Sequence, residues 1–261
     1  MYHRGESICY DEDMVQLVGI LNVTPDSFSD GGKFLDAQAA ITQADKLFND
    51  GASLVDVGAE STRPNADILD DDQEWERLEP ILKTLILKYP GKISLDSYHP
   101  ATIKKAFKIG PVIINDVTGF NDPAMRELAA SLQATVIISH LPSGLTIQQA
   151  HELTPISTVE QVKDELLARA KMLEDMGLSK DKIILDPGIG FGKIPEVNQQ
   201  LLTFARLVTD YKVMIGYSRK RFLGEHRMEL APNLAAGKIA IENGAAYLRV
   251  HDVAGHAKLL G

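Results

Sequence analysis

Residues 21–32 hold the first group of side chains whose types could carry out chemistry. They read Leu-Asn-Val-Thr-Pro-Asp-Ser-Phe-Ser-Asp-Gly-Gly and follow an apolar run over residues 17–21. An apolar run that changes abruptly into polar turn residues is typical of a buried strand ending in a functional loop. At the strand tip, the amide oxygen of Asn22 could bind a hard cation such as Mg2+ without burying a second charge. The polar segment that follows suits an active-site lid, since it closes on two glycines after Asp26, Ser27, Ser29 and Asp30.

Short apolar runs alternate with helical patterns along the whole chain. The runs cover residues 17–21, 54–57, 93–95, 112–114, 135–138, 183–185, 213–215 and 247–250. The helical patterns cover residues 37–48, 73–88, 100–108, 123–130, 159–176, 195–208 and 233–242, and a last helix is expected over 252–261. Short apolar runs of this kind indicate strands buried on both faces, and such strands separated by helices form a parallel sheet.

Eight such strands can close into a barrel, so the pattern predicts an α/β fold, a single eight-stranded parallel (β/α)8 TIM barrel. We expect one domain over residues 1–261, because a chain of this length with 44% hydrophobic residues can bury one sizeable core. Residues 1–14 are expected to form a short hairpin at the barrel bottom. A doubly wound open sheet is the alternative, but it would bind ligands at one switch point, whereas polar residues here follow nearly every strand.

Composition argues against several classes of partner. The formal net charge of −9 speaks against nucleic-acid binding as the main role, because neutralising phosphates requires a basic face. A single cysteine, Cys9, cannot form an internal disulfide, which fits a reducing compartment. Apolar runs are too short to span a membrane, and residues 1–13 are too polar for a secretion signal. We therefore expect a cytoplasmic protein that binds neither membrane nor nucleic acid.

The barrel would bring distant polar residues together, because the carboxyl ends of all its strands share one face. The residues expected there are Asn22, Glu60, Asp96, Asn115, His140, Asp186, Ser218 and His251. A planar, nitrogen-rich heterocycle needs acceptors in its plane, and Lys220 could add a donor to the acceptors Asp96, Asn115 and Asp186. Opposite them, a cationic set suits a diphosphate: Arg63, Arg249 and His251. Asn22 with Mg2+ would complete this anion site.

Each of these residues also has a plainer interpretation. Asp96 and Asp186 could be helix N-caps, a common position for aspartate. His140 could be a structural histidine of the core. The acidic run 70–72 together with Glu74 reads as a solvated helix start that the helix dipole favours.

Two long motifs resemble the dihydropteroate synthases. One is residues 21–32, and the other is Gly-Ala-Glu-Ser-Thr-Arg-Pro at residues 58–64, at the spacing that family uses. Shorter matches follow in order at residues 95–97, 114–116, 186–193, 218–220 and 249–252, so the resemblance spans about residues 17 to 253. It implies an Mg2+-assisted condensation of 6-hydroxymethyl-7,8-dihydropterin diphosphate with 4-aminobenzoate that releases pyrophosphate. It also implies a homodimer.

The resemblance assigns a role to each candidate residue. Asp96, Asn115, Asp186 and Lys220 would bind the pterin. The diphosphate would be bound by Asn22, Thr62, Arg63, Arg249 and His251, with the metal on Asn22. Positive charge on the pterin methylene would be balanced by the carboxylates of Asp30 and Asp96, which join Arg63 and Lys220 as catalytic residues. The 4-aminobenzoate pocket would comprise Phe28, Ser61, Thr62, Pro64, Phe191 and Ser218, next to Lys220.

Two alternative functions are considered. A barrel that transfers a methyl group from methyltetrahydrofolate would need the pterin acceptors but not the cationic set. A catalytically altered pterin-binding paralogue would be expected to lose polar residues at the strand ends, which this chain keeps. The chain departs from the family pattern at Ser139, at Asn65 and in a shortened segment before Arg249, none of which removes a proposed reacting group.

Overall fold

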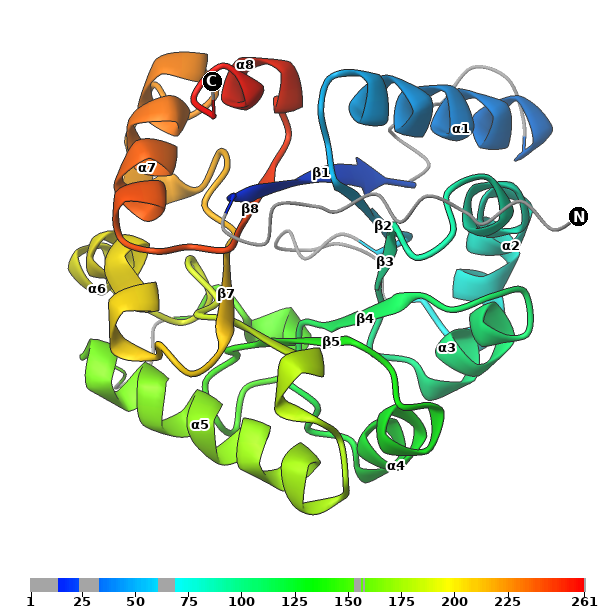
Figure 1. Ribbon diagram of the computed structural model, residues 1–261, viewed down its shortest axis with the longest axis horizontal. Helices are drawn as coiled ribbons and strands as arrows, with labels where there is room; N and C mark the ends of the chain where they lie inside the picture. The colour runs from blue at the N-terminus through cyan, green and yellow to red at the C-terminus, as the bar shows by residue number, and fades with distance from the viewer. Residues whose placement is uncertain (1–13, 24–32, 61–68, 153–155, 157, 261) are drawn as a thin grey trace, which may run out of the picture.

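Eight parallel strands form a closed barrel in the computed structural model, which describes residues 14–23, 33–60, 69–152, 156 and 158–260 (Figure 1). The strands pair in sequence order, and β8 pairs with β1 to close the ring. Their bounds are β1 Gln16–Asn22, β2 Leu54–Gly58, β3 Ile93–Asp96, β4 Ile113–Asp116, β5 Val136–Ser139, β6 Ile183–Asp186, β7 Lys212–Ile215 and β8 Tyr247–Val250. The predicted TIM barrel is confirmed. The hairpin expected over residues 1–14 lies outside the described residues except for Met14.

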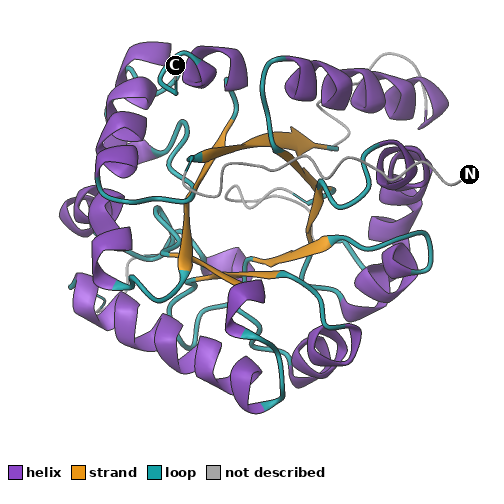
Figure 2. Cartoon of the chain, viewed as in Figure 1, coloured by secondary structure: helices purple, strands orange, loops and turns teal. Residues whose placement is uncertain are grey.

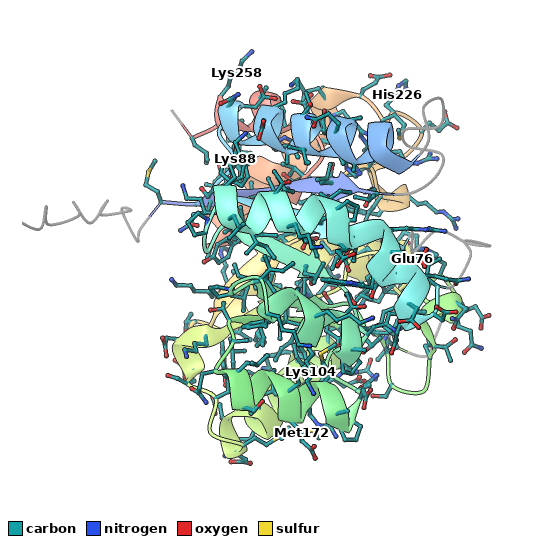
Figure 3. All side chains as sticks on the ribbon, turned by 90° about the vertical axis from the view of Figure 1, so that its right-hand side faces the viewer. Glu76, Lys88, Lys104, Met172, His226 and Lys258 are labelled. Carbon is teal, nitrogen blue, oxygen red and sulfur yellow. The ribbon has the colours of Figure 1, made fainter. Side chains whose placement is uncertain are left out.

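Helices surround the barrel on its outside (Figure 2). They are α1 Lys33–Asn49, α2 Asp71–Lys88, α3 Pro100–Phe107, α4 Pro123–Leu132, α5 Val159–Asp175, α6 Pro195–Gln200, α7 Leu230–Glu242 and α8 Val253–Ala257. Charged side chains such as Glu76, Lys88 and Lys104 project from their outer faces (Figure 3). None of the helices within the described ranges is long and apolar enough to cross a membrane.

Two helix predictions need correction. The helix expected over residues 195–208 is α-helical only to Gln200 and continues as the 3-10 helix η4 Leu201–Leu207. The buried residues of η4 repeat every third position, as a helix with three residues per turn requires: Leu201 with Phe204, and Leu202 with Ala205. The last helix, α8, ends at Ala257 and is shorter than the range predicted for it.

Inward-facing side chains form two layers inside the barrel. The lower layer is an apolar cluster of Val18, Leu54, Ile137, Ile184, Met214 and Tyr247. Strand residues two positions further along the chain face the same side, so a polar layer lies above it. The strand register aligns Asn22 with Gly58, Gly58 with Asp96, and Asp96 with Asn115. A ring of polar groups therefore lies above the apolar layer, at the carboxyl ends of the strands.

Candidate active site

A cavity of about 910 Å3 opens at the carboxyl ends of the strands. Its lining includes ten of the residues that the sequence placed at this face or in the substrate pockets: Asn22, Glu60, Asp96, Asn115, Asp186, Phe191, Ser218, Lys220, Arg249 and His251. The volume suits a ligand of drug size, and polar groups converge on it from all eight strands or the loops that follow them. The predicted convergence of distant polar residues is therefore observed.

Arg249, on β8, lines this cavity and joins two carboxylates. Its Nε donates to Asp56 Oδ2 at 2.6 Å, and its Nη2 donates to Asp96 Oδ2 at 2.9 Å. Burial and the neighbouring Asp56 raise the pKa of Asp96 to about 7, against the opposing effect of Arg249. The sequence assigned Arg249 to the diphosphate. The structure places its guanidinium beside Asp96, which the sequence assigned to the pterin.

Asn115 and Asp186 line the cavity from β4 and β6. The Asn115 Nδ2 donates to both oxygens of Asp56, at 3.2 and 3.0 Å. Asp186 Oδ1 accepts from the backbone N–H of Gly188 at 2.8 Å, which forms a local turn rather than a helix cap. Burial raises the pKa of Asp186, while Lys220 acts in the opposite direction. Neither Asp96 nor Asp186 is a helix N-cap, because the N-cap of α3 is His99 and that of α6 is Ile194.

Lys220 lies on the side of Asp186, and its ammonium group is held by two contacts. Its Nζ donates to the backbone oxygen of Ile189 and stands 4.7 Å from the centroid of the Phe191 ring. Burial lowers the pKa of Lys220 to about 8, and Asp186 opposes this shift. Lys220 therefore interacts both with Asp186, which the sequence assigned to the pterin, and with Phe191, which it assigned to 4-aminobenzoate.

Ser218 and His251 line the cavity just after the ends of β7 and β8. The His251 Nδ1 lies 2.9 Å from Ser218 Oγ, and the backbone N–H of His251 donates to the same oxygen at 3.3 Å. This pair fixes the imidazole at the end of β8, on the side where Asn22 also lines the cavity. Ser218 was predicted for the 4-aminobenzoate pocket, and the structure shows that it also orients His251.

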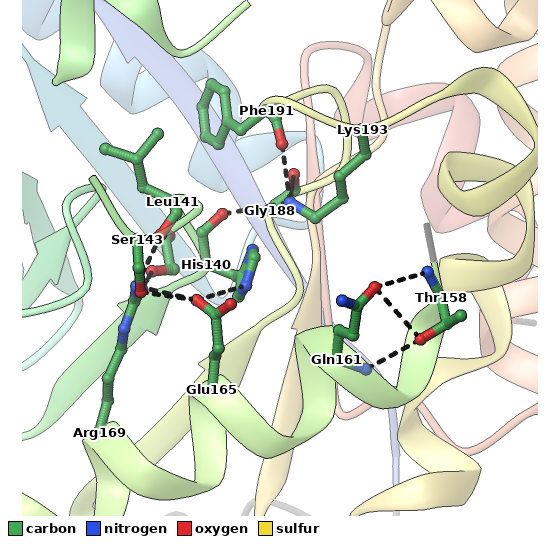
Figure 4. Close-up of polar contacts among 11 residues, drawn as sticks. His140, Leu141, Ser143, Thr158, Gln161, Glu165, Arg169, Gly188, Phe191 and Lys193 are labelled. Carbon is green, nitrogen blue, oxygen red and sulfur yellow. Dashed lines mark hydrogen bonds and ion pairs between the residues drawn. The ribbon is translucent and has the colours of Figure 1, made fainter. Parts of the chain in front are cut away.

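Two buried basic side chains, Lys193 and Arg169, brace the loops that follow β5 and β6 (Figure 4). Lys193 Nζ donates to the backbone oxygens of Gly188 and Phe191, both at 2.9 Å, and to that of His140 at 3.3 Å. Arg169, from α5, donates to the Leu141 oxygen at 2.6 Å. Burial lowers the pKa of Lys193 well below its usual value. Lys193 thus holds the loop backbone that carries Phe191, and Arg169 holds the loop after β5.

His140 is fully buried and does not line the cavity. Its Nε2 lies 3.4 Å from Glu165 Oε2, and burial lowers the pKa of His140 to about 4, so the ring is neutral at pH 7. The structure favours the plainer interpretation, a structural histidine.

A second polar group lies beside the cavity where β2 and β3 end. Glu60 Oε1 accepts from the backbone N–H of Leu69 at 2.6 Å, and His99 Nδ1 lies 2.6 Å from Asp71 Oδ1. The interaction with Glu60 is the main cause that raises the pKa of His99 to about 9.

The prediction of a solvated helix start is wrong for Glu74. This side chain is 1% exposed and accepts from Ser97 Oγ at 2.9 Å, and burial raises its pKa. It faces inward because it lies on the same face of α2 as Leu78 and Ile81.

Sequence reasoning missed Asp56, because it stands inside the apolar run of β2. A charged residue two positions before the strand end faces the same side as the mouth residues, and this alternation was the available signal. Six predicted site residues lie outside the described residues: Phe28, Asp30, Ser61, Thr62, Arg63 and Pro64.

Asn22 is the predicted metal ligand, and it lines the cavity at the tip of β1. Within the described ranges no group of three His, Cys, Asp or Glu side chains is placed to hold a metal ion. A single amide oxygen can be enough protein ligation for Mg2+, because this ion keeps several waters and takes further ligands from substrate phosphates. The site is compatible with a metal that arrives with a phosphorylated substrate.

Comparison with known proteins adds independent findings. Residues 18–251 match the family model described as "Pterin binding enzyme". The dihydropteroate synthase of Haemophilus influenzae is 34% identical over 97% of this chain and 94% of its own length. A crystal structure of dihydropteroate synthase from Clostridium difficile, obtained with pteroic acid, superposes with a TM-score of 0.86 at 33% identity, covering 96% of both chains. A structure of the Xanthomonas albilineans enzyme with 4-aminobenzoic acid has a TM-score of 0.85 at 35% identity, covering 95% of this chain and 92% of that one.

Proposed function

The chain belongs to the pterin binding enzyme family, and on that premise we propose that it is a transferase that performs the dihydropteroate synthase reaction of folate biosynthesis. The substrates are 6-hydroxymethyl-7,8-dihydropterin diphosphate and 4-aminobenzoate. One observation carries the proposal. A single cavity holds the acceptors Asp96, Asn115 and Asp186 next to the cation Lys220, with Arg249 and His251 in the same lining.

The reaction forms a bond between the amine nitrogen of 4-aminobenzoate and the pterin methylene carbon. The carbon–oxygen bond to the diphosphate breaks, pyrophosphate leaves with the bonding electrons, and the extra amine proton passes to solvent. Because the arylamine is neutral near pH 7, the step requires neither a strong base nor a covalent intermediate. The chain must instead orient two flat substrates and balance charge.

The pterin site is formed by strand ends. Asp186 and Asn115 offer oxygen acceptors to ring N–H groups, and Lys220 offers a donor to a ring carbonyl or nitrogen. Asp96 also lines the cavity and would balance the positive charge that develops on the methylene. Asp30 and Arg63 are proposed to act with it on the strength of the sequence alone.

The leaving group is negatively charged and requires cations. Arg249 and His251 belong to the described cavity, and Thr62 and Arg63 are added from the sequence. Asn22 would hold Mg2+, which when bound neutralises part of the diphosphate charge.

The second substrate is proposed to lie between Phe191 and Ser218, with Phe28, Ser61 and Pro64 completing the pocket.

Three further features are proposed from the sequence and the family. We expect a homodimer, a cytoplasmic location, and no nucleic-acid or membrane partner. Light scattering at several protein concentrations tests the homodimer, because a constant monomer mass would contradict it.

Pyrophosphate release measured with and without 4-aminobenzoate tests the reaction. A dihydropteroate synthase releases pyrophosphate together with dihydropteroate, and the amount depends on both substrates. A methyltransferase-like barrel releases none, and an inactive paralogue binds the pterin diphosphate without turnover. Absence of dihydropteroate in the presence of Mg2+ and both substrates would refute the proposed function.

A further inference from the structure

Asp56 is buried directly beneath the proposed pterin site and does not line the cavity. Its side chain has 0% exposure and faces the barrel interior from β2. Both of its oxygens accept hydrogen bonds from residues that do line the cavity. Asn115 Nδ2 donates to Oδ1 at 3.2 Å and to Oδ2 at 3.0 Å, and Arg249 Nε donates to Oδ2 at 2.6 Å.

This contact fixes which end of the Asn115 amide faces the cavity. An ionised carboxylate only accepts hydrogen bonds, so the amide must turn its NH2 group toward Asp56. If the amide were reversed, its oxygen would oppose the carboxylate oxygens, and two acceptors would face each other. The amide oxygen is therefore the polar atom that Asn115 can offer to a ligand in the cavity.

The Asn115 oxygen is also an unused acceptor. It is buried, and no donor among the described residues bonds to it. A buried acceptor without a partner is unfavourable, and a ligand N–H group would satisfy it. The ring of a pterin carries such donors, above all its exocyclic amino group, whereas the 2,4-dioxo analogue lumazine has a carbonyl oxygen at that position.

We propose that Asp56 is a positioning residue that makes Asn115 a hydrogen-bond acceptor and thereby selects 2-aminopteridines over their 2-oxo analogues. The proposal rests on the proposed function, because it assumes that the pterin binds beside Asn115. Asp56 itself does not touch the ligand. It acts through Asn115, and it also holds the Nε of Arg249.

The substitution Asp56→Asn tests this inference by reversing the polarity of the contact. The new amide oxygen takes the position of Oδ2, to which both Arg249 Nε and Asn115 Nδ2 donate in the unsubstituted protein, and the new NH2 group takes the position of Oδ1. At that position the NH2 group opposes the NH2 group of Asn115, so two donors face each other. The Asn115 amide then reverses and presents its own NH2 group to the cavity. Dissociation constants for pterin and lumazine, measured by calorimetry, give the preference as a ratio. We expect the pterin preference to fall at least tenfold relative to the unsubstituted protein.

The exchange variant Asp56→Asn/Asn115→Asp provides a rescue with unchanged total charge. The amide at position 56 now donates to the carboxylate at position 115, which presents an acceptor oxygen to the cavity again. We expect this variant to recover the pterin preference to within about threefold. A matched control is Asp116→Asn, which removes another fully buried carboxylate, one that accepts from Thr118 and Phe120 rather than from a cavity residue.

Each outcome decides the matter. Equal weakening of both ligands in Asp56→Asn, or no recovery in the exchange variant, would overturn the inference. If Asp56→Asn does not fold, the exchange variant alone decides by its preference, and failure of both to fold would assign Asp56 a purely structural role. An unsubstituted protein that binds pterin no better than lumazine would also overturn the inference. Absence of dihydropteroate formation with Mg2+ and both substrates would instead contradict the proposed function, so the two failures are distinguishable.

Discussion

The side chains at the barrel mouth hold one another in place through a chain of contacts between opposite charges. Arg249 joins Asp56 to Asp96, and Lys220 lies beside Asp186. Removing one partner of a buried charge pair costs several kcal/mol, because the remaining charge is left without compensation. Substitutions in this group therefore affect stability as well as binding, and each test needs a measurement of both.

Asp186→Ala should weaken pterin binding. The carboxylate offers acceptors in a buried pocket, and unpaired ring donors would cost about 1–3 kcal/mol, which is roughly a 5- to 150-fold loss of affinity. Calorimetric titration with a pterin measures this loss. Asp181→Ala, at an exposed carboxylate before β6, is the control. An unchanged affinity in Asp186→Ala would remove the residue from the site.

The raised pKa of Asp96 predicts how the stability of the protein depends on pH. Its folded-state pKa of about 7 lies above the ordinary value of 3.8, so protonation favours the folded state. This contribution is fully present below about pH 4 and is lost as the pH rises through 7. Asp96→Asn abolishes the titration. Relative to the unsubstituted protein, the variant should therefore gain about 1–3 kcal/mol in the free energy of unfolding between pH 4.5 and pH 8.

Urea unfolding at the two pH values measures this difference. Asp210→Asn, at a side chain with 76% exposure, is the matched control and should show no such gain. A variant whose stability changes with pH in parallel with the unsubstituted protein would show that the pKa of Asp96 is not raised.

Which residues form the site could be predicted from the sequence largely because strand ends carry them. Asn115 and Asp186 follow apolar runs, and a barrel gathers such positions. Arg249 lies inside the run 247–250 and was found through the motif match at residues 249–252. Asp56 could not be identified as a site residue in this way, because the role of a carboxylate inside an apolar strand depends on which residues bond to it. The partners, Asn115 and Arg249, lie 59 and 193 residues away in the sequence.

At the scale of elements, the loop after β6 depends on close backbone packing. Gly188 adopts a φ of +62°, and a Cβ atom at this position would lie 2.1 Å from the His140 backbone oxygen. The same loop gives Asp186 its N–H partner and Lys193 one of its acceptors. The position therefore needs glycine both for its conformation and for space.

Gly188→Ala should destabilise the fold by about 2–4 kcal/mol, since both the left-handed backbone and the steric contact oppose a side chain. It should also weaken pterin binding, because the turn that orients Asp186 would shift. Chemical denaturation measures the first effect and calorimetry the second. Gly177→Ala is a matched control: its φ of +90° carries a similar strain, but no atom lies within 4 Å of the added Cβ. Equal destabilisation by both substitutions would mean that contact with His140 is unimportant.

The helix bounds illustrate what sequence patterns leave open. The start of α2 was recognised from its acidic run, and Asp70 caps it with bonds from Asp72 and Gln73. The burial of Glu74 was missed, because composition does not say which face of the first turn is buried. The run of apolar residues in η4 likewise fits both helical periods until its neighbours are known.

At the scale of the whole molecule, the barrel was predictable because its signal is repeated eight times. Each apolar run corresponds to one observed strand, and several strands extend one residue further, to a polar residue such as Asn22, Asp96 or Asp186. Backbone hydrogen bonds continue the ladder past the last apolar side chain, since they do not depend on side-chain type. Closure of the sheet then sets the mouth residues at one end of a rigid scaffold.

The two substrate sites differ in how they are attached to this scaffold. The proposed pterin site lies on the ends of β3, β4 and β6, within the hydrogen-bonded barrel. The proposed 4-aminobenzoate pocket takes Ser61, Thr62 and Pro64 from the segment after β2, and Phe28 from the segment after β1. The first site belongs to the sheet, and the second is completed by connections between elements.

This difference predicts an order of binding. Pterin diphosphate should bind first, because its acceptors are preformed, and its diphosphate with Mg2+ should then fix the segments that complete the second pocket. A sulfonamide, which imitates 4-aminobenzoate, should bind measurably only when pyrophosphate, Mg2+ and a pterin are present. Titrating a sulfonamide first into the protein alone and then into the protein with these three ligands tests the order. Omitting only the pyrophosphate is the control that separates the anion from the pterin. Sulfonamide binding to the protein alone that is as tight as binding to the loaded protein would show that the second pocket is complete without the first substrate.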